Sequence, residues 1–135
     1  MPGETNLQKL LGSMSPELLP DVFVFVTLPQ EAAIPDGVAP LMTFREREGL
    51  TLIVRESEAR AFELPFAFPS RMITLNVHSS LEAVGFLAVI TTRLAAAGMG
   101  VNPISAYFHD HLFVPSERAD EAMQLLLRLV DDNRK

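Results

Sequence analysis

The order of the predicted elements in the C-terminal half constrains the fold of this chain more than any other sequence feature. Strands are predicted for residues 71–78 (RMITLNVH), 101–108 (VNPISAYF) and 111–115 (HLFVP), which are rich in β-branched and aromatic residues. Helices are predicted for residues 81–97 and 116–131, where apolar residues recur at helical spacing. A strand–helix–strand–strand–helix order predicts an α+β fold in which helices cover one face of an antiparallel sheet.

The N-terminal half follows a similar order in a less regular form. Residues 22–28 (VFVFVTL) have the composition of a strand that is buried on both faces. Three prolines in residues 29–40 exclude a long helix there, and a hairpin with its turn near Gly49 follows. A short amphipathic helix is predicted near the N-terminus. After it, Ser15-Pro16 is typical of an N-cap and a first helical residue, which predicts one more helical turn.

Two pairs of similar segments suggest an internal duplication. Residues 52–61 (LIVRESEARA) and 112–122 (LFVPSERADEA) each join the second strand of a hairpin to a helix rich in Glu, Arg and Ala, and VFVFVT parallels MITLNV. The first copy would have lost most of its first helix to the proline-rich loop. We therefore predict two units, residues 1–68 and 69–135. Because the second unit ends in a helix, its fourth strand must be missing or supplied by residues 22–28.

The composition of the 135-residue chain excludes several classes of protein and partner. Apolar residues make up 48% and charged residues 21%, as in an ordinary globular domain. The 17 acidic residues outnumber the 11 basic ones, and the resulting charge of −6 argues against nucleic acid or an anionic membrane as partner. The lack of cysteine excludes disulfides, thiolate catalysis and sulfur-ligated zinc. No signal peptide or membrane-spanning run is recognisable, so a cytoplasmic protein is expected.

Three phrases of the sequence resemble a known family. MTFREREGLTLIV, VHSSLEAVGFLA and FHDHLFVP together resemble small bacterial proteins made of two ACT-like units, the ACT domain being a ligand-sensing module of amino-acid metabolism. The resemblance implies a ferredoxin-like βαββαβ fold in each unit, with antiparallel sheets paired through duplication or oligomerisation, so a homodimer is expected. It also implies amino-acid binding at the first strand–helix corner, where the family's glycine matches Gly85. The corner HSSLEAVG has serines in place of an acidic residue and Val84 in place of a proline, so specificity does not carry over.

The corner itself has features that suit a carboxylate. The first amides of a helix lack partners within the helix and lie at the positive end of its dipole, and a glycine there lets a ligand approach closely. We expect the ligand to lie between this corner and a neighbouring ACT-like unit. Its carboxylate would lie near residues 84–86, its ammonium group near Glu82 or a strand carbonyl, and Asn102 at its side. The alternative is a plain helix cap, with Gly85 needed only for packing. The candidate ligand-binding residues are Ser79, Ser80, Leu81, Glu82, Ala83, Val84, Gly85, Phe86 and Asn102.

The predicted helix 81–97 leads to two further expectations. A Gly85→Val variant should lose binding but keep its fold, since valine costs little within a helix. If one apolar face packs on the sheet, Phe86, Val89 and Ile90 remain as a second apolar face. That second face is either covered by the other half of the chain or forms a subunit interface.

The histidines are the remaining candidates for chemistry. His109-Asp110-His111, together with His78, could form a metal site or supply a general base beside a serine. The same residues also suit a tight turn, and nothing in their spacing makes the three histidines converge. No nucleophile–base pair, phosphate-binding loop or metal cluster is recognisable, so neither catalysis, a metal nor a cofactor is expected.

The function predicted from the sequence is that of a non-catalytic regulatory or sensor protein that binds an amino acid. One alternative is an ACT-type oligomerisation module that binds no ligand, and another is a histidine-dependent enzyme. Ligand-dependent thermal stabilisation without turnover would distinguish the sensor from both alternatives.

Overall fold

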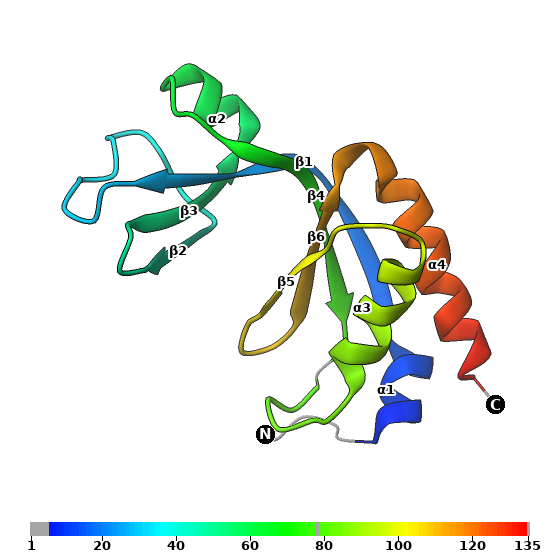
Figure 1. Ribbon diagram of the computed structural model, residues 1–135. Helices are drawn as coiled ribbons and strands as arrows, with labels where there is room; N and C mark the ends of the chain where they lie inside the picture. The colour runs from blue at the N-terminus through cyan, green and yellow to red at the C-terminus, as the bar shows by residue number, and fades with distance from the viewer. Residues whose placement is uncertain (1–5, 78, 135) are drawn as a thin grey trace. The chain divides into compact units, whose positions relative to one another are not determined.

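The computed structural model describes residues 6–77 and 79–134. These residues divide into two compact units: Asp21–Ser70, here called the central unit, and the described parts of Met1–Pro20 and Arg71–Lys135, here called the C-terminal unit. Along the chain the elements are α1 (Leu7–Ser13), β1 (Ser15–Leu28), β2 (Met42–Arg45), β3 (Leu50–Arg55), α2 (Glu56–Ala61), β4 (Ala67–Asn76), α3 (Phe86–Ala96), β5 (Asn102–Ser105), β6 (Asp110–Pro115), the 3-10 turn η1 (Ser116–Arg118) and α4 (Ala119–Asp132) (Figure 1).

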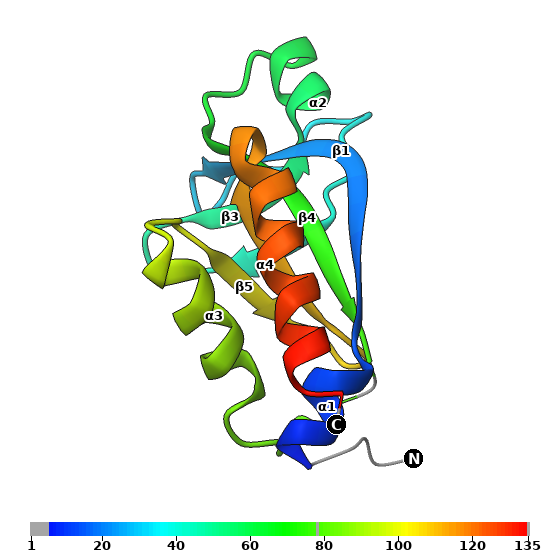
Figure 2. The ribbon, with the colours of Figure 1, turned by 90° about the vertical axis from the view of Figure 1, so that its right-hand side faces the viewer.

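The C-terminal unit has the strand order of a ferredoxin-like fold. Its strands follow the order β1-β4-β6-β5, and β5 pairs with β6 in antiparallel register. Helices α3 and α4 lie on the same face of this sheet (Figure 2). The elements β4, α3, β5, β6 and α4 therefore supply βαββα in chain order, and the beginning of β1 supplies the last strand. This confirms the predicted α+β fold.

The source of that last strand differs from the prediction. Residues 15–20, not residues 22–28, lie in the C-terminal unit, where β1 neighbours β4. The helical turn predicted for Ser15-Pro16 is wrong, because this dipeptide begins strand β1. The Nε of Arg71 on β4 donates a hydrogen bond of 2.8 Å to the carbonyl of Leu19. Pairing between distant segments thus overrides the local capping signal, and proline is tolerated because this strand forms an edge of the unit's sheet.

The core of the C-terminal unit lies between the sheet and three helices. Helix α3 buries Phe86, Ile90 and Leu94, which lie one turn apart along one face. Of the two outcomes expected for Phe86 and Ile90, cover by the other half of the chain is confirmed, since they are only 3% and 0% exposed. Leu10 of helix α1 and Met14, the C-cap of that helix, belong to the same cluster, so α3 is covered by this N-terminal segment as well as by the sheet.

The central unit is the less regular of the two. Its strands β1 and β3 pair in antiparallel register, and β2 pairs with the other edge of β3. Helix α2 covers a small core that contains Val24, Leu52 and Ala59. No helix forms in residues 29–41, and Ile34 of this loop packs on the core instead. The predicted replacement of a helix by the proline-rich loop is confirmed, and the fold matches two ferredoxin-like units.

Candidate functional site

The corner between β4 and α3 is longer than predicted. Helix α3 begins at Phe86, not at residue 81, because Gly85 is its N-cap and has a left-handed φ of 88°. Ahead of it, the amide of Glu82 donates a hydrogen bond of 3.0 Å to Ser80 Oγ, which stabilises a turn instead of a helix. The expectation that Gly85→Val keeps the fold is therefore wrong in its premise, since this position is not helical and a β-branched residue is strained at positive φ.

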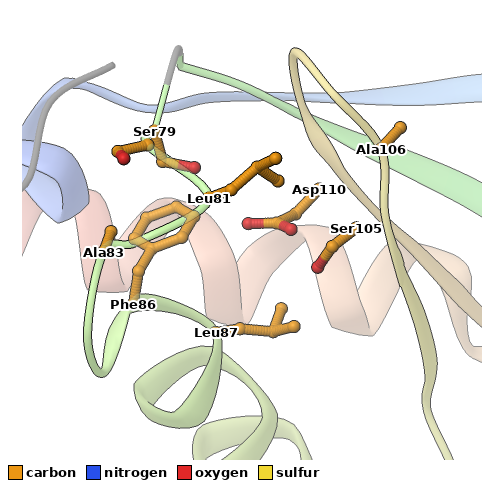
Figure 3. A pocket seen from close by; sticks show the side chains of 9 residues that line it. Ser79, Leu81, Ala83, Phe86, Leu87, Ser105, Ala106 and Asp110 are labelled. Atoms are coloured by element: carbon orange, nitrogen blue, oxygen red, sulfur yellow. The ribbon is translucent and has the colours of Figure 1, made fainter. Parts of the chain in front are cut away.

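A cavity of about 210 Å³ opens at this corner, within the C-terminal unit. It lies between the corner loop, the start of α3 and the hairpin that joins β5 to β6 (Figure 3). The volume is below the roughly 300 Å³ from which pockets for drug-sized ligands start, so it suits a small metabolite. The lining residues are Ser79, Ser80, Leu81, Ala83, Phe86, Leu87, Ser105, Ala106 and Asp110.

The hairpin supplies the charged part of this cavity. Ser105, the last residue of β5, lies directly opposite Asp110, the first residue of β6. Figure 3 shows the carboxylate of Asp110 pointing into the space between Leu81, Phe86 and Leu87. Asp110 is the one charged residue among the described residues that line the cavity. The cavity is therefore apolar on the helix side and acidic on the strand side.

Further polar groups come from the corner. The Oγ of Ser80 accepts a hydrogen bond from the backbone, so its hydroxyl proton is available to donate to a ligand. Ser79 adds a second hydroxyl to the lining. The N-cap Gly85 provides no side-chain acceptor for the first amides of α3, and Phe86 and Leu87 of that first turn line the cavity. The cavity thus combines an acidic group with hydrogen-bond donors.

The structure brings together part of the predicted site. Ser79, Ser80, Leu81, Ala83 and Phe86 line the cavity. Glu82, Val84, Gly85 and Asn102 do not line it. Val84 is 84% exposed. Asn102 lies three residues before Ser105, which places the two side chains on opposite faces of β5.

The hairpin residues of the cavity and the second residue of α3 were not predicted from the sequence. These are Leu87, Ser105, Ala106 and Asp110. A signal for two of them was present, because the four-residue loop AYFH sets Ser105 opposite Asp110 once both flanks are strands. The sequence interpretation placed Asp110 in the turn itself, where its side chain would not have been directed to the helix side of the sheet.

The histidines do not form a metal or catalytic cluster among the described residues. The rings of His109 and His111 are 6.4 Å apart, centroid to centroid. The Nδ1 of His111 lies 3.0 Å from Thr74 Oγ1, and that of His109 lies 3.4 Å from the carbonyl of Val77. Within residues 6–77 and 79–134, no group of His, Asp and Glu is arranged to hold a metal ion. His78 lies outside the described residues.

Burial lowers the pKa of His111 below its ordinary value. Partial desolvation is the main cause, and the nearby His109 lowers the pKa further, while the negative charge of Asp110 raises it. Since successive side chains of a strand point to opposite faces, His111 lies on the face of β6 opposite to Asp110 and the cavity. The imidazole of His111 therefore belongs to the sheet and not to the candidate site.

Comparison with protein families identifies the chain. Two models of the ACT domain match it, one at residues 2–71 and the other at residues 67–128. The chain belongs to the ACT domain family. It carries two ACT domains in tandem, and the cavity lies at the first strand–helix corner of the second ACT domain. None of the described helices is long and apolar enough to cross a membrane.

Three solved structures are similar in fold to this chain. A protein of unknown function from Vibrio cholerae, described as a possible transport protein, is 43% identical with a TM-score of 0.82, over 92% of this chain and 95% of that chain. A protein from Agrobacterium tumefaciens is 18% identical with a TM-score of 0.73, over 87% of this chain and 89% of that one. The regulatory subunit of aspartate kinase from Thermus flavus is 11% identical with a TM-score of 0.58, over 96% of this chain and 99% of that one. Comparison with curated protein sequences gives no match.

Proposed function

We propose that this tandem ACT protein is a non-catalytic regulatory protein that senses an amino acid at the corner between β4 and α3. The observation that carries the proposal is the small cavity at this corner, which combines an acidic side chain, serine hydroxyls and the uncapped start of a helix. A free amino acid is a small zwitterion, so it needs both hydrogen-bond donors and an anionic group in one site. The ACT family, whose members sense ligands of this class, supports the same conclusion.

The proposed pose sets the ligand's carboxylate at the start of α3. The amides of Phe86 and Leu87 and the hydroxyl of Ser80 are the available donors, and the helix dipole favours a negative group there. Gly85 contributes through its left-handed backbone, which ends the corner loop and starts the helix at this point. The ligand's side chain would lie against Leu81 and Leu87.

The composition of the cavity favours binding over catalysis. Acyl transfer by a serine needs a base within hydrogen-bond reach, and among the described residues no histidine, lysine or second carboxylate lines the cavity. A regulatory protein of this kind would act in the cytoplasm, on the pathway whose amino acid it binds. The two sequence repeats of the proposal are residues 1–68 and 69–135; in the folded chain, residues 6–20 of the first repeat lie in the compact unit of the second.

Exposed apolar side chains near the cavity support the proposal of a homodimer. Leu81 and Val84 of the corner are 68% and 84% exposed, and Tyr107 and Phe108 of the neighbouring hairpin are 66% and 62% exposed. Sedimentation equilibrium should give twice the monomer mass for the wild-type chain. A Val84→Glu and Tyr107→Glu double variant should shift it toward the monomer, and a monomeric wild type would contradict the dimer without affecting the proposed ligand site.

A thermal-shift screen against the twenty proteinogenic amino acids, followed by calorimetric titration, tests the proposed function. A ligand present at 100 times its Kd stabilises the folded state by about 2.7 kcal/mol, which raises the Tm by several degrees. Ala83→Phe should remove this shift because it fills the cavity, whereas Ala88→Phe, on the exposed side of α3, should keep it. If no amino acid binds the wild type at millimolar concentration, the proposed sensor function is wrong and the corner is only a helix cap.

A further inference from the structure

We infer that Asp110 binds the ammonium group of the ligand and makes the cavity select neutral and basic amino acids over acidic ones. The inference rests on the proposed amino-acid-binding function and adds the class of ligand. It assigns the ammonium group to the side chain of Asp110 in the hairpin, whereas the sequence had suggested Glu82 in the corner loop or a strand carbonyl. Glu82 is exposed and does not line the cavity.

The position of Asp110 is fixed by the sheet. Asp110 and Ser105 form a directly opposed pair across the β5–β6 hairpin, which sets their Cβ atoms about 5 Å apart on the same face. The hairpin is closed by a hydrogen bond of 3.0 Å from the amide of Ala106 to the carbonyl of His109. A carboxylate on a strand is held more rigidly than one on a loop. The hydroxyl of Ser105, opposite Asp110, can accept a second hydrogen bond from the same ammonium group.

The carboxylate of Asp110 has no partner that satisfies it within the described residues. It is half-buried, and its side chain makes neither a hydrogen bond nor an ion pair there; its negative charge acts on His111, on the other face of the strand. Since no buried side-chain oxygen of the described residues lacks a partner, the unpaired oxygens of Asp110 are accessible and can receive a hydrogen bond from a ligand. A cationic group in the cavity would supply that partner, which is why the geometry favours an ammonium group.

The charge balance of the cavity then decides the class of amino acid. A neutral α-amino acid brings one negative group, for the donors at the start of α3, and one positive group, for Asp110. An acidic side chain would add a second negative charge to a cavity in which, among the described residues, no lysine or arginine is present. Repulsion between like charges a few ångströms apart near a protein surface should weaken the binding of aspartate and glutamate on the order of tenfold or more.

Calorimetric titration of the wild type, Asp110→Asn and Asp131→Asn with all twenty amino acids tests this inference. Asn is nearly isosteric with Asp but uncharged, and Asp131, an exposed residue of α4 outside the cavity, provides the matched control. Asp110→Asn should weaken the binding of neutral amino acids on the order of tenfold to a hundredfold, as expected for a charge-assisted hydrogen bond, and should reduce the discrimination against aspartate. Asp131→Asn should bind as the wild type does.

A second probe separates a charge effect from a change in fold. The 2-hydroxy analogues of alanine and leucine lack the ammonium group, so they should bind Asp110→Asn no more weakly than they bind the wild type. The Tm of Asp110→Asn without ligand should equal or exceed that of the wild type without ligand. The inference is overturned, with the proposed function intact, if amino acids bind Asp110→Asn as tightly as they bind the wild type. It is also overturned if the wild type binds aspartate as tightly as neutral amino acids. If no amino acid binds the wild type, the proposed function and the inference both fail.

Discussion

Leu7 of helix α1 lies beside Gly85, the N-cap of α3: a Cβ built on Gly85 would be 3.6 Å from Leu7 Cδ2. This is an ordinary van der Waals distance, so space alone does not require glycine at position 85. The requirement comes from the backbone, since φ is 88° at this residue. Glycine at this corner is therefore needed by the fold as well as by the proposed ligand site.

Replacing Gly85 should destabilise the protein. Gly85→Ala is expected to lower the free energy of unfolding by about 1–2 kcal/mol, because a left-handed conformation brings a Cβ too close to the following carbonyl oxygen. Gly85→Val should lower it further, because its Cβ is branched. Gly100→Ala is the control, since no atom lies within 4 Å of its Cβ and its φ is not positive. Urea unfolding measures all three, and an unchanged stability of Gly85→Ala would contradict the left-handed backbone.

Truncating Ile90 should affect stability and not assembly. Ile90 is fully buried in the core of the C-terminal unit. Ile90→Ala should therefore lower the free energy of unfolding by about 2–5 kcal/mol. Thr92→Ala, exposed on the same helix, should change it by less than about 0.5 kcal/mol. If Ile90 instead lay at a subunit interface, sedimentation would show dissociation of Ile90→Ala with little change in the stability of the monomer.

Ser70 should contribute to the central unit through one buried hydrogen bond. Its side chain is 0% exposed, and its hydroxyl donates a hydrogen bond of 3.0 Å to the carbonyl of Phe23 on β1. Ser70→Ala should lower the free energy of unfolding by about 0.5–1.5 kcal/mol. Ser57→Ala, exposed on α2, should have almost no effect. Chemical denaturation of both variants measures the difference, and equal stabilities would show that water replaces the bond in solution.

Stability should fall on mild acidification because of His111. The folded state holds its pKa below the unfolded value of about 6.5, mainly through burial. Between these two pKa values the unfolded chain binds more protons, so the free energy of unfolding decreases as the pH falls through this window. His111→Gln should reduce that dependence. Urea unfolding between about pH 5 and pH 7.5, with NMR titration of the His111 ring, measures the effect, and identical slopes in both proteins would refute it.

Local patterns in the sequence determined the type and order of most elements. The hairpin and helix repeated in LIVRESEARA and LFVPSERADEA appear as β3–α2 and β6–α4, because alternation, helical spacing and turn residues act over a few neighbouring positions. The three ACT-like phrases indicated the family, which the family models confirm. Part of the candidate site, from Ser79 to Phe86, was also predicted, since it is one continuous corner.

Only the tertiary structure decided the features that depend on contacts between distant segments. Residues 15–20 become a strand because β4 pairs with them, although their local signal favours a helical turn. The buried face of α3 is set by α1 as well as by the sheet. Asp110 reaches the cavity because pairing between β5 and β6 directs it toward the first turn of α3, where Phe86 and Leu87 lie more than twenty residues away along the chain. Such contacts depend on the packing of the whole unit, and no short stretch of sequence specifies them.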